Sequence, residues 1–263
     1  MTEQSAALTY SSYLALDELL SAQRPRSDEH DEMLFIVIHQ VYELWFKQIL
    51  HELGHLQRQM EEGHGAHTLH TLHRVLTILK VVVAQIDVLE TMTPRQFTSF
   101  RTRLEASSGF QSGQFRELEV TLGRRDRGAF EHYPEGNPSR DRIIGAMARP
   151  SLFDSFLRYL AARGYSVPAE KLERDVRLPA EPSEAVQRLI VQVYRDDGDA
   201  AQITERLVDV DEGLQEWRYR HVKMVERTIG RKPGTGGSSG VEYLRSTLFS
   251  PFFPDLWAVR SEL

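Results

Sequence analysis

Apolar residues recur every three or four positions over most of the chain, which is the spacing of one face of an α-helix. This pattern predicts three long helices, at Asp31–Met60, His67–Met92 and Ala200–Ile229. The second of them has a continuous apolar face, formed by Leu69, Leu72, Val75, Ile78, Val82, Ile86 and Leu89. Gly230 and Pro233 are expected to end the third, because glycine and proline commonly follow the last turn of a helix.

The remaining segments also have helical periodicity. Thr93-Pro94-Arg95-Gln96 has the pattern of a capping box with proline in the first turn, and it predicts a short helix that ends near Ala106. Further helices are predicted at Gln111–Leu122, on both sides of Pro150 between Arg140 and Gly164, and at Pro182–Tyr194, with a loop from Gly128 to Arg140. No run long enough to form a β-strand alternates between apolar and polar residues with a period of two. We therefore predict an all-α fold, with residues 1–263 forming one domain of long antiparallel helices.

The composition of the chain argues against several classes of protein. The chain has 263 residues, is 41% hydrophobic and carries a net charge of -6, which argues against nucleic-acid binding. It has no cysteine, which excludes disulfides, thiolate metal sites and a cysteine nucleophile and fits a cytoplasmic protein. The longest apolar run, Val81 to Ala84, is far shorter than the roughly 20 residues that span a membrane. The N-terminus lacks the pattern of a secretory signal.

His51-Glu52-Leu53-Gly54-His55 matches the H-E-x-x-H motif of zinc peptidases, in which two histidines bind the metal and the glutamate activates water. The extended motif would place a third histidine at position 61, where this chain has Glu61. The helix face that bears both histidines is polar throughout, with Gln40, Glu43, Lys47, His51, His55 and Arg58. A solvated face is therefore the favoured interpretation, and a zinc metallopeptidase is the weaker alternative.

Two other histidines lie in apolar surroundings. His39 ends the run Leu34–His39, and His221 continues the apolar stripe of the third long helix, after Leu207, Val210, Leu214 and Trp217. Taken alone, each is most simply a buried histidine with a hydrogen-bond partner. Alternatively, His221 could ligate iron, and without thiolates or a histidine–carboxylate cluster a single axial histidine favours haem over zinc.

Two polar features complete the candidate chemistry. Arg101 shares a helix face with Phe97, and an arginine flanked by aromatic rings suits a planar carboxylate, although such arginines are also common at surfaces. The glycine-rich segment Arg231–Leu244, with Thr235 at its centre, is neither a P-loop nor a dinucleotide-binding fingerprint. It predicts either a polar lid over a pocket or a plain surface connection.

Several long segments, in this order along the chain, resemble the tryptophan 2,3-dioxygenase family. They are SYLALDELLSAQ, DEMLFIVIHQVYELWFKQIL, LETMTPRQFTSFRTRLEASSGFQSGQFRELE, LVDVDEGLQEWRYRHVKMVERTIG, GTGGSSGVEYL and FFPDLWAVR, between about Leu8 and Arg260. The resemblance implies an all-α fold enclosing a haem pocket. It also implies a homotetramer, a dimer of dimers, in which the N-terminal residues 1–25 contact a neighbouring subunit.

The resemblance also implies roles for individual residues. His221 matches the axial ligand of the haem iron, and His39 matches the histidine that meets the indole N–H, either as a base or only to orient the substrate. Arg101 and Thr235 match the residues that bind the carboxylate and ammonium of the amino acid. Three other positions match the pocket: Phe35 beside the substrate, Phe97 where other members have tyrosine, and Ser108 near the haem. Tyr10, Tyr13 and Leu14 match the segment that reaches the pocket of a neighbouring subunit.

The implied reaction is oxidative cleavage of the indole C2–C3 bond of L-tryptophan by O2, giving N-formyl-L-kynurenine in the first step of tryptophan catabolism via kynurenine. The implied cofactor is haem b, one per subunit and ferrous when active. There are two further alternatives. One is a related haem oxygenase that acts on a substituted tryptophan or inserts one oxygen atom, which would use the same residues. The other is a helical haem-binding or sensor module without turnover.

Overall fold

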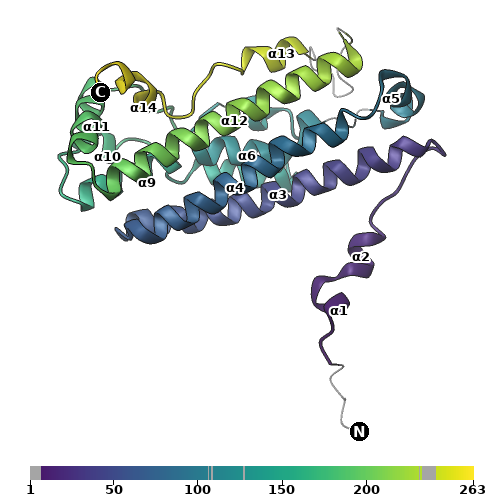
Figure 1. The fold of residues 1–263 in the computed structure, drawn as a ribbon, viewed down its shortest axis with the longest axis horizontal. Coiled ribbons are helices and arrows are strands. Elements are labelled where there is room, and N and C mark those ends of the chain that lie inside the picture. Colours follow the sequence, from purple (N-terminus) through teal and green to yellow (C-terminus); the bar gives the residue numbers. More distant parts are fainter. Residues whose placement is uncertain (1–6, 106, 108, 127, 231, 233–240) are drawn as a thin grey trace.

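The computed structural model describes residues 7–105, 107, 109–126, 128–230, 232 and 241–263, and every regular element in these ranges is helical. Its centre consists of the three long helices α3 (His30–Glu61), α4 (Gly65–Leu89) and α12 (Asp199–Ile229). Helix α4 packs against both α3 and α12, and α3 runs antiparallel to them (Figure 1). The predicted all-α class and the three long helices are confirmed.

Shorter helices surround this centre. They are α1 (Tyr10–Leu14), α2 (Leu16–Leu20), α5 (Pro94–Arg101), α6 (Gly113–Leu122), α7 (Gly128–Glu131), α8 (Pro138–Met147), α9 (Leu152–Ala162), α10 (Ala169–Leu172), α11 (Glu184–Asp196), α13 (Val241–Ser246) and α14 (Pro254–Ala258). Three 3-10 turns occur at Thr102–Leu104, Gly109–Gln111 and Val259–Ser261.

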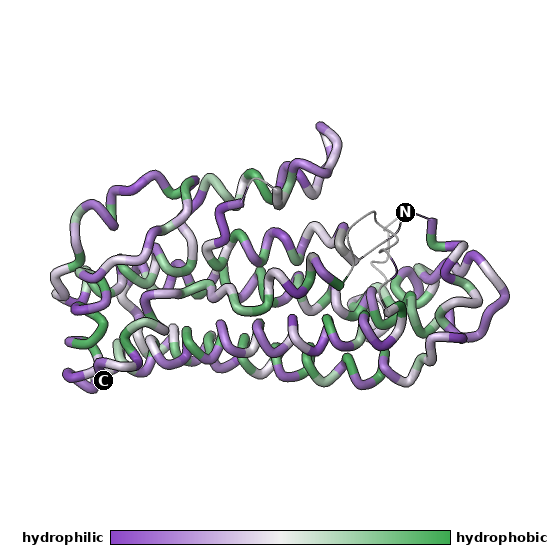
Figure 2. The backbone as a smooth tube through the Cα atoms, turned by 90° about the horizontal axis from the view of Figure 1, so that it is seen from above, coloured by the Kyte–Doolittle hydropathy of each residue, from purple (hydrophilic) through white to green (hydrophobic). Residues whose placement is uncertain are grey.

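The core forms where the apolar faces of the long helices meet. The predicted face of α4 is buried from Leu72 to Leu89, and α12 buries Leu207, Val210 and Leu214 against it. Figure 2 shows apolar and polar residues alternating along the long helices, as expected when each buries one side. Each fully buried leucine or isoleucine contributes about 2 kcal/mol through the hydrophobic effect, so this shared face fixes the relative positions of the three helices.

Local signals set most helix ends as predicted. At α5 the backbone N–H of Gln96 donates to the Thr93 hydroxyl (3.3 Å), and the Thr93 N–H donates to the Gln96 side chain (2.8 Å). Gly230 ends α12 with a φ of 62°, a conformation that favours glycine. Some boundaries differ from prediction. Helix α4 ends at Leu89 rather than Met92, and α5 changes to a 3-10 turn after Arg101. The predicted loop at 128–140 contains the short helix α7 and the start of α8.

The N-terminal helices α1 and α2 stand away from the bundle (Figure 1) and contain no buried residue. They nevertheless carry large apolar side chains, and the most exposed of these in and beside α1 and α2 are Leu8, Tyr10, Tyr13 and Leu20. Within the described ranges, no helix combines the length and apolarity needed to cross a lipid bilayer.

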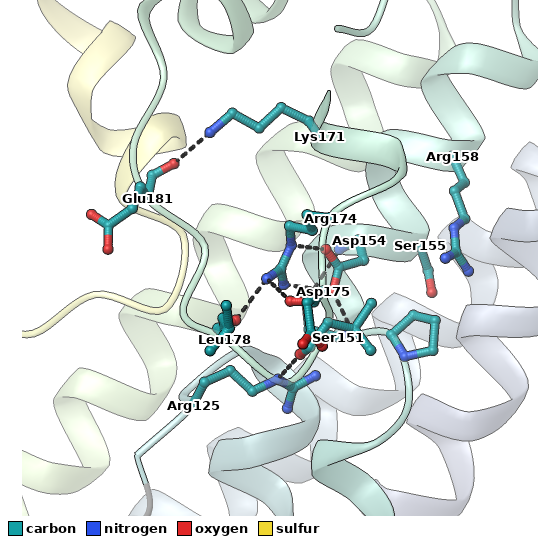
Figure 3. Close-up of polar contacts among 12 residues, drawn as sticks. Arg125, Ser151, Asp154, Ser155, Arg158, Lys171, Arg174, Asp175, Leu178 and Glu181 are labelled. Carbon is teal, nitrogen blue, oxygen red and sulfur yellow. Dashed lines mark hydrogen bonds and ion pairs between the residues drawn. The ribbon is translucent and has the colours of Figure 1, made fainter. Parts of the chain in front are cut away.

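The segment between α9 and α11 is held to the bundle mainly by arginines (Figure 3). Arg174 donates two hydrogen bonds to Asp154 (2.7 and 2.9 Å) and one to the carbonyl of Leu178 (2.6 Å). Asp154 also accepts the backbone N–H of Ser151 (2.7 Å) at the start of α9. Arg125 donates to the carbonyl of Val176 (2.7 Å). These bonds attach a stretch with little regular structure to the rest of the fold.

Candidate functional site

A cavity lies at the end of the bundle where α3 begins and α4 and α12 end. Figure 1 shows these three helix ends at the same end of the bundle. Most of its wall is apolar, formed by Phe35, Phe46, Ile86, Leu89, Met92, Phe97, Leu104, Phe115, Trp217, Met224, Val225 and Leu244. Polar side chains are fewer, and they include His39, Glu43, Arg101, Arg116, Arg218 and His221. A largely apolar cavity with a few convergent polar groups is typical of a site for a small molecule or cofactor.

His39 lies on α3, and its hydrogen bond fixes which ring nitrogen carries the proton. Its Nδ1 is 2.7 Å from the carbonyl oxygen of Phe35. Because a carbonyl can only accept, Nδ1 must donate. Burial lowers the pKa of His39 below its ordinary 6.5, although this hydrogen bond and the nearby Glu43 oppose the effect. In the resulting neutral ring, Nε2 has a free lone pair and can accept a hydrogen bond from a bound molecule.

An aromatic cluster adjoins His39. The Phe35 ring lies 4.2 Å from the His39 ring, 5.7 Å from the Phe97 ring and 5.6 Å from the Phe100 ring, measured between centroids. Phe100 is fully buried and anchors α5 against α3. This packing places Arg101, the last residue of α5, at the cavity wall. Phe97 has no hydroxyl group, so it contributes only apolar surface there.

His221 lies on α12 and lines the same cavity. Burial lowers its pKa to about 4, and the proximity of His39 contributes in the same direction, so the ring is neutral near pH 7. Among the described residues none forms a hydrogen bond with the His221 ring. A neutral imidazole that faces a cavity and lacks a protein partner can ligate a metal ion through its free lone pair.

Positive charge gathers at the wall formed by α6 and α12. Glu119 accepts hydrogen bonds from Arg116 (2.6 Å), Arg124 (3.0 Å) and Arg218 (2.8 Å). Three guanidinium groups around one carboxylate leave a positive excess, and both Arg116 and Arg218 reach the cavity. Apolar walls, an unpartnered histidine and adjacent positive charge fit a haem, which is a flat apolar ring with an iron centre and two carboxylates.

Five of the residues predicted from the sequence meet at this cavity: Phe35, His39, Phe97, Arg101 and His221. The N-terminal residues do not line it, because Tyr10, Tyr13 and Leu14 lie on α1 with exposed fractions of 76%, 72% and 41%. The other two predicted residues, Ser108 and Thr235, lie outside the described residues.

The H-E-x-x-H segment lies elsewhere on α3. His51 is exposed, whereas Glu52 is buried and accepts hydrogen bonds from Gln48 (2.7 Å) and Arg74 (3.2 Å). The Glu52 carboxylate is therefore already engaged by neighbouring side chains. In the part of the chain that the structure describes, no three histidine, cysteine or acidic residues group in a way that would hold a metal ion.

Two cavity residues were not recognised from the sequence. Trp217 precedes His221 by one helical turn, and this spacing could have indicated a contact between the two rings. Glu43 was assigned to the solvated face of α3, but it lines the cavity and accepts a hydrogen bond from Gln114 (2.8 Å). Its assignment failed because periodicity along α3 does not show that α6 covers this part of the helix.

Comparison with known proteins points to one family. A family profile described as tryptophan 2,3-dioxygenase matches residues 1–141 and 182–263. The chain is 69% identical to the tryptophan 2,3-dioxygenase of Anaeromyxobacter sp. (strain K), with 98% of this chain and 97% of the relative covered. It is 56% identical to that of Herpetosiphon aurantiacus, covering 98% and 100% of the two chains, and 46% identical to that of Caulobacter vibrioides, covering 97% and 98%.

Proposed function

The chain belongs to the tryptophan 2,3-dioxygenase family, and from this premise we propose that it is an oxidoreductase that cleaves the indole C2–C3 bond of L-tryptophan. The oxidant is O2, and the product is N-formyl-L-kynurenine, which begins tryptophan catabolism via kynurenine. The observation that carries the proposal is the convergence of His39, Arg101 and His221 on one largely apolar cavity. These residues offer a hydrogen-bond acceptor, a carboxylate partner and an iron ligand.

The proposed cofactor is haem b, one per subunit, and His221 would hold its iron. When bound, ferrous haem supplies the redox chemistry that activates O2. His221 suits this role because its pKa is lowered by burial and its ring is neutral, so ligation requires no proton release. Arg116 and Arg218 would offset the negative charge of the haem carboxylates.

Arg101 is proposed to bind the carboxylate of tryptophan. A guanidinium forms two parallel hydrogen bonds with a carboxylate, which fixes the direction in which the indole enters the cavity. Thr235 is proposed to contact the ammonium and carboxylate from the glycine-rich segment, and Ser108 is proposed to lie near the haem. Since Phe97 replaces the tyrosine of other members, carboxylate recognition depends more heavily on Arg101 and Thr235. Holding the substrate at both ends removes much of the entropic cost of reaction.

His39 is proposed to accept the indole N–H through Nε2, because its Nδ1 already donates to the Phe35 carbonyl. This bond would fix the rotation of the indole within the cavity, beside the rings of Phe35 and Phe97. Comparing L-tryptophan with 1-methyl-L-tryptophan tests the assignment, because the methylated substrate has no N–H. Replacing His39 with alanine should slow turnover of tryptophan much more than turnover of the methylated substrate. Equal slowing of both would contradict a hydrogen bond to this N–H.

We also propose a cytoplasmic homotetramer, a dimer of dimers, in which the N-terminal residues 1–25 contact a neighbouring subunit. The exposed apolar side chains of α1 and α2 support this, since contact with another chain would remove them from water. Tyr10, Tyr13 and Leu14 would then reach the neighbour's cavity. Light scattering of the full chain, and of a variant with serine at positions 10 and 13, tests the assembly. A full-length monomer at micromolar concentration would contradict it.

The central experiment follows haem and product in three proteins. Wild-type protein reconstituted with haem should show a histidine-ligated ferrous spectrum and convert tryptophan to N-formyl-L-kynurenine, with both atoms of labelled O2 in the product. His221→Ala should lose haem, whereas His39→Ala should keep haem and lose turnover. His51→Ala, on the exposed face of α3, is the matched control and should behave as wild type. A wild type that cannot bind haem would overturn the proposal, and a single labelled oxygen would indicate a monooxygenase.

A further inference from the structure

The His221 ring lies against a second aromatic ring from the same helix. The ring of Trp217 is parallel to that of His221 within 5°, with 5.1 Å between their centroids. Residues four positions apart on an α-helix are neighbours on one face, so both side chains reach the same side of α12. At this centroid distance two parallel rings are offset rather than directly superposed, which is a favourable arrangement for aromatic pairs.

Trp217 is itself held in place by rings from two other helices. Phe46 and Tyr42 of α3 meet it edge-on, at centroid distances of 6.0 Å and 6.4 Å and interplanar angles of 87° and 69°. Phe115 of α6 lies 4.7 Å away and is tilted by 41°. Because these three rings surround the indole, it cannot turn without displacing core side chains. The plane of the Trp217 ring is therefore fixed, and the His221 ring stacks against this plane.

In the described part of the protein, no hydrogen bond to the imidazole of His221 accounts for its orientation. The Trp217 Nε1 is buried and has no hydrogen-bond partner in the described part of the protein, and the His221 ring has none there either. Histidines that ligate metals are usually oriented by a hydrogen bond to their second nitrogen. Here the restraint acts on the face of the imidazole instead. A face contact leaves both nitrogens, which lie on the ring edge, uncovered.

We propose that Trp217 is a positioning residue for His221, which sets the plane of the imidazole by stacking and so orients it toward the haem iron. The inference rests on the proposed function, because it takes His221 as the axial ligand. It adds that the orientation of this ligand depends on an aromatic neighbour four residues earlier. Trp217→Phe should preserve the effect, since phenylalanine keeps a flat ring at this position, whereas Trp217→Leu should remove it.

The test compares haem-loaded wild type, Trp217→Phe and Trp217→Leu. The iron–histidine vibration of the ferrous proteins is measured by resonance Raman spectroscopy, and haem loss is measured by transfer to apomyoglobin. Trp217→Leu should shift or broaden the vibration and release haem about three- to tenfold faster, as expected from the typical strength of an aromatic pair. Trp217→Phe should remain within about twofold of wild type. Trp217→Met serves the same purpose if the leucine variant does not fold.

Trp45→Leu is the matched control for loss of an indole. Trp45 also has a buried Nε1 without a partner in the described residues, and it packs on the core, but it does not line the cavity. An unchanged vibration and unchanged haem loss in Trp217→Leu would overturn the inference, as would equal effects from Trp45→Leu. If wild type itself fails to take up haem, the proposed function fails, and that result is distinct from failure of the stacking role.

Discussion

Replacing Glu119 with glutamine removes the carboxylate that Arg116, Arg124 and Arg218 share beside the cavity. The Glu119 side chain is 3% exposed, and those of Arg218 and Arg116 are 4% and 9% exposed. Arg124, at 24%, retains some contact with water. A glutamine of the same size could accept hydrogen bonds from at most part of this set, and the buried guanidinium groups of Arg116 and Arg218 would lose the negative charge of Glu119.

The expected cost is large compared with that of a surface pair. Removing one partner of a buried ion pair typically destabilises a protein by about 3–5 kcal/mol, because the remaining charge stays desolvated. Total stability is commonly only about 5–15 kcal/mol, so this loss should be plain in urea denaturation followed by circular dichroism. Glu184→Gln is the matched control. Its partner Arg188 and Glu184 are 69% and 89% exposed, and such pairs contribute about 0–1 kcal/mol.

The loss of stability caused by Glu119→Gln should also depend on pH. Burial alone would raise the pKa of Glu119, but Arg116, Arg124 and Arg218 outweigh it and hold the pKa below the ordinary 4.5. A carboxylate with a lowered pKa in the folded state contributes its full stability above the unfolded value and loses it as the pH falls through the folded value. The difference between wild type and Glu119→Gln should therefore shrink below pH 4.5. A difference under about 1 kcal/mol at pH 7 would refute the argument.

Three further predictions concern other parts of the structure. Asp211→Ala leaves one buried and two partly buried N–H groups without their acceptor, so the free energy of unfolding measured in urea should fall by about 2–5 kcal/mol, and a change below about 1 kcal/mol would contradict this. Because burial lowers the pKa of His39, the pH profile of turnover should stay flat through pH 6.5 and decline only below it; a midpoint above 6.5 would be inconsistent. Gly113→Ala should lower the melting temperature, because a Cβ there would lie 2.4 Å from Ser139, whereas Gly145→Ala, in open space, should not.

The long helices could be predicted from the sequence because periodicity and end signals are local. The apolar face from Leu72 to Leu89, the capping box at Thr93 and the end of α12 at Gly230 all depend on residues within a few positions of one another. The helices that the sequence pattern did not predict are short. Helix α7 has only four residues, and a single turn produces no repeat that periodicity can detect.

Local sequence patterns predicted the candidate site less well than they predicted the helices. Local pattern gave His39 and His221 each an ordinary structural explanation, and only the ordered resemblance to a family joined them. Their shared cavity depends on α3 beginning, and α12 ending, at the same end of the bundle, which no local pattern encodes. The orientation of the Trp217 ring likewise depends on Phe46 and Phe115, which come from elements distant in sequence.

The two walls that bear the histidines are separated by a helix that carries none of the cavity's polar groups. Helix α4 packs between α3 and α12 and contributes only Ile86 and Leu89 to the lining. On α3 and α12, by contrast, apolar and polar lining residues alternate on the same helix. Shortening either aliphatic side chain would enlarge the cavity without altering His39, Arg101 or His221, and this makes α4 the natural starting point for engineering acceptance of bulkier substrates.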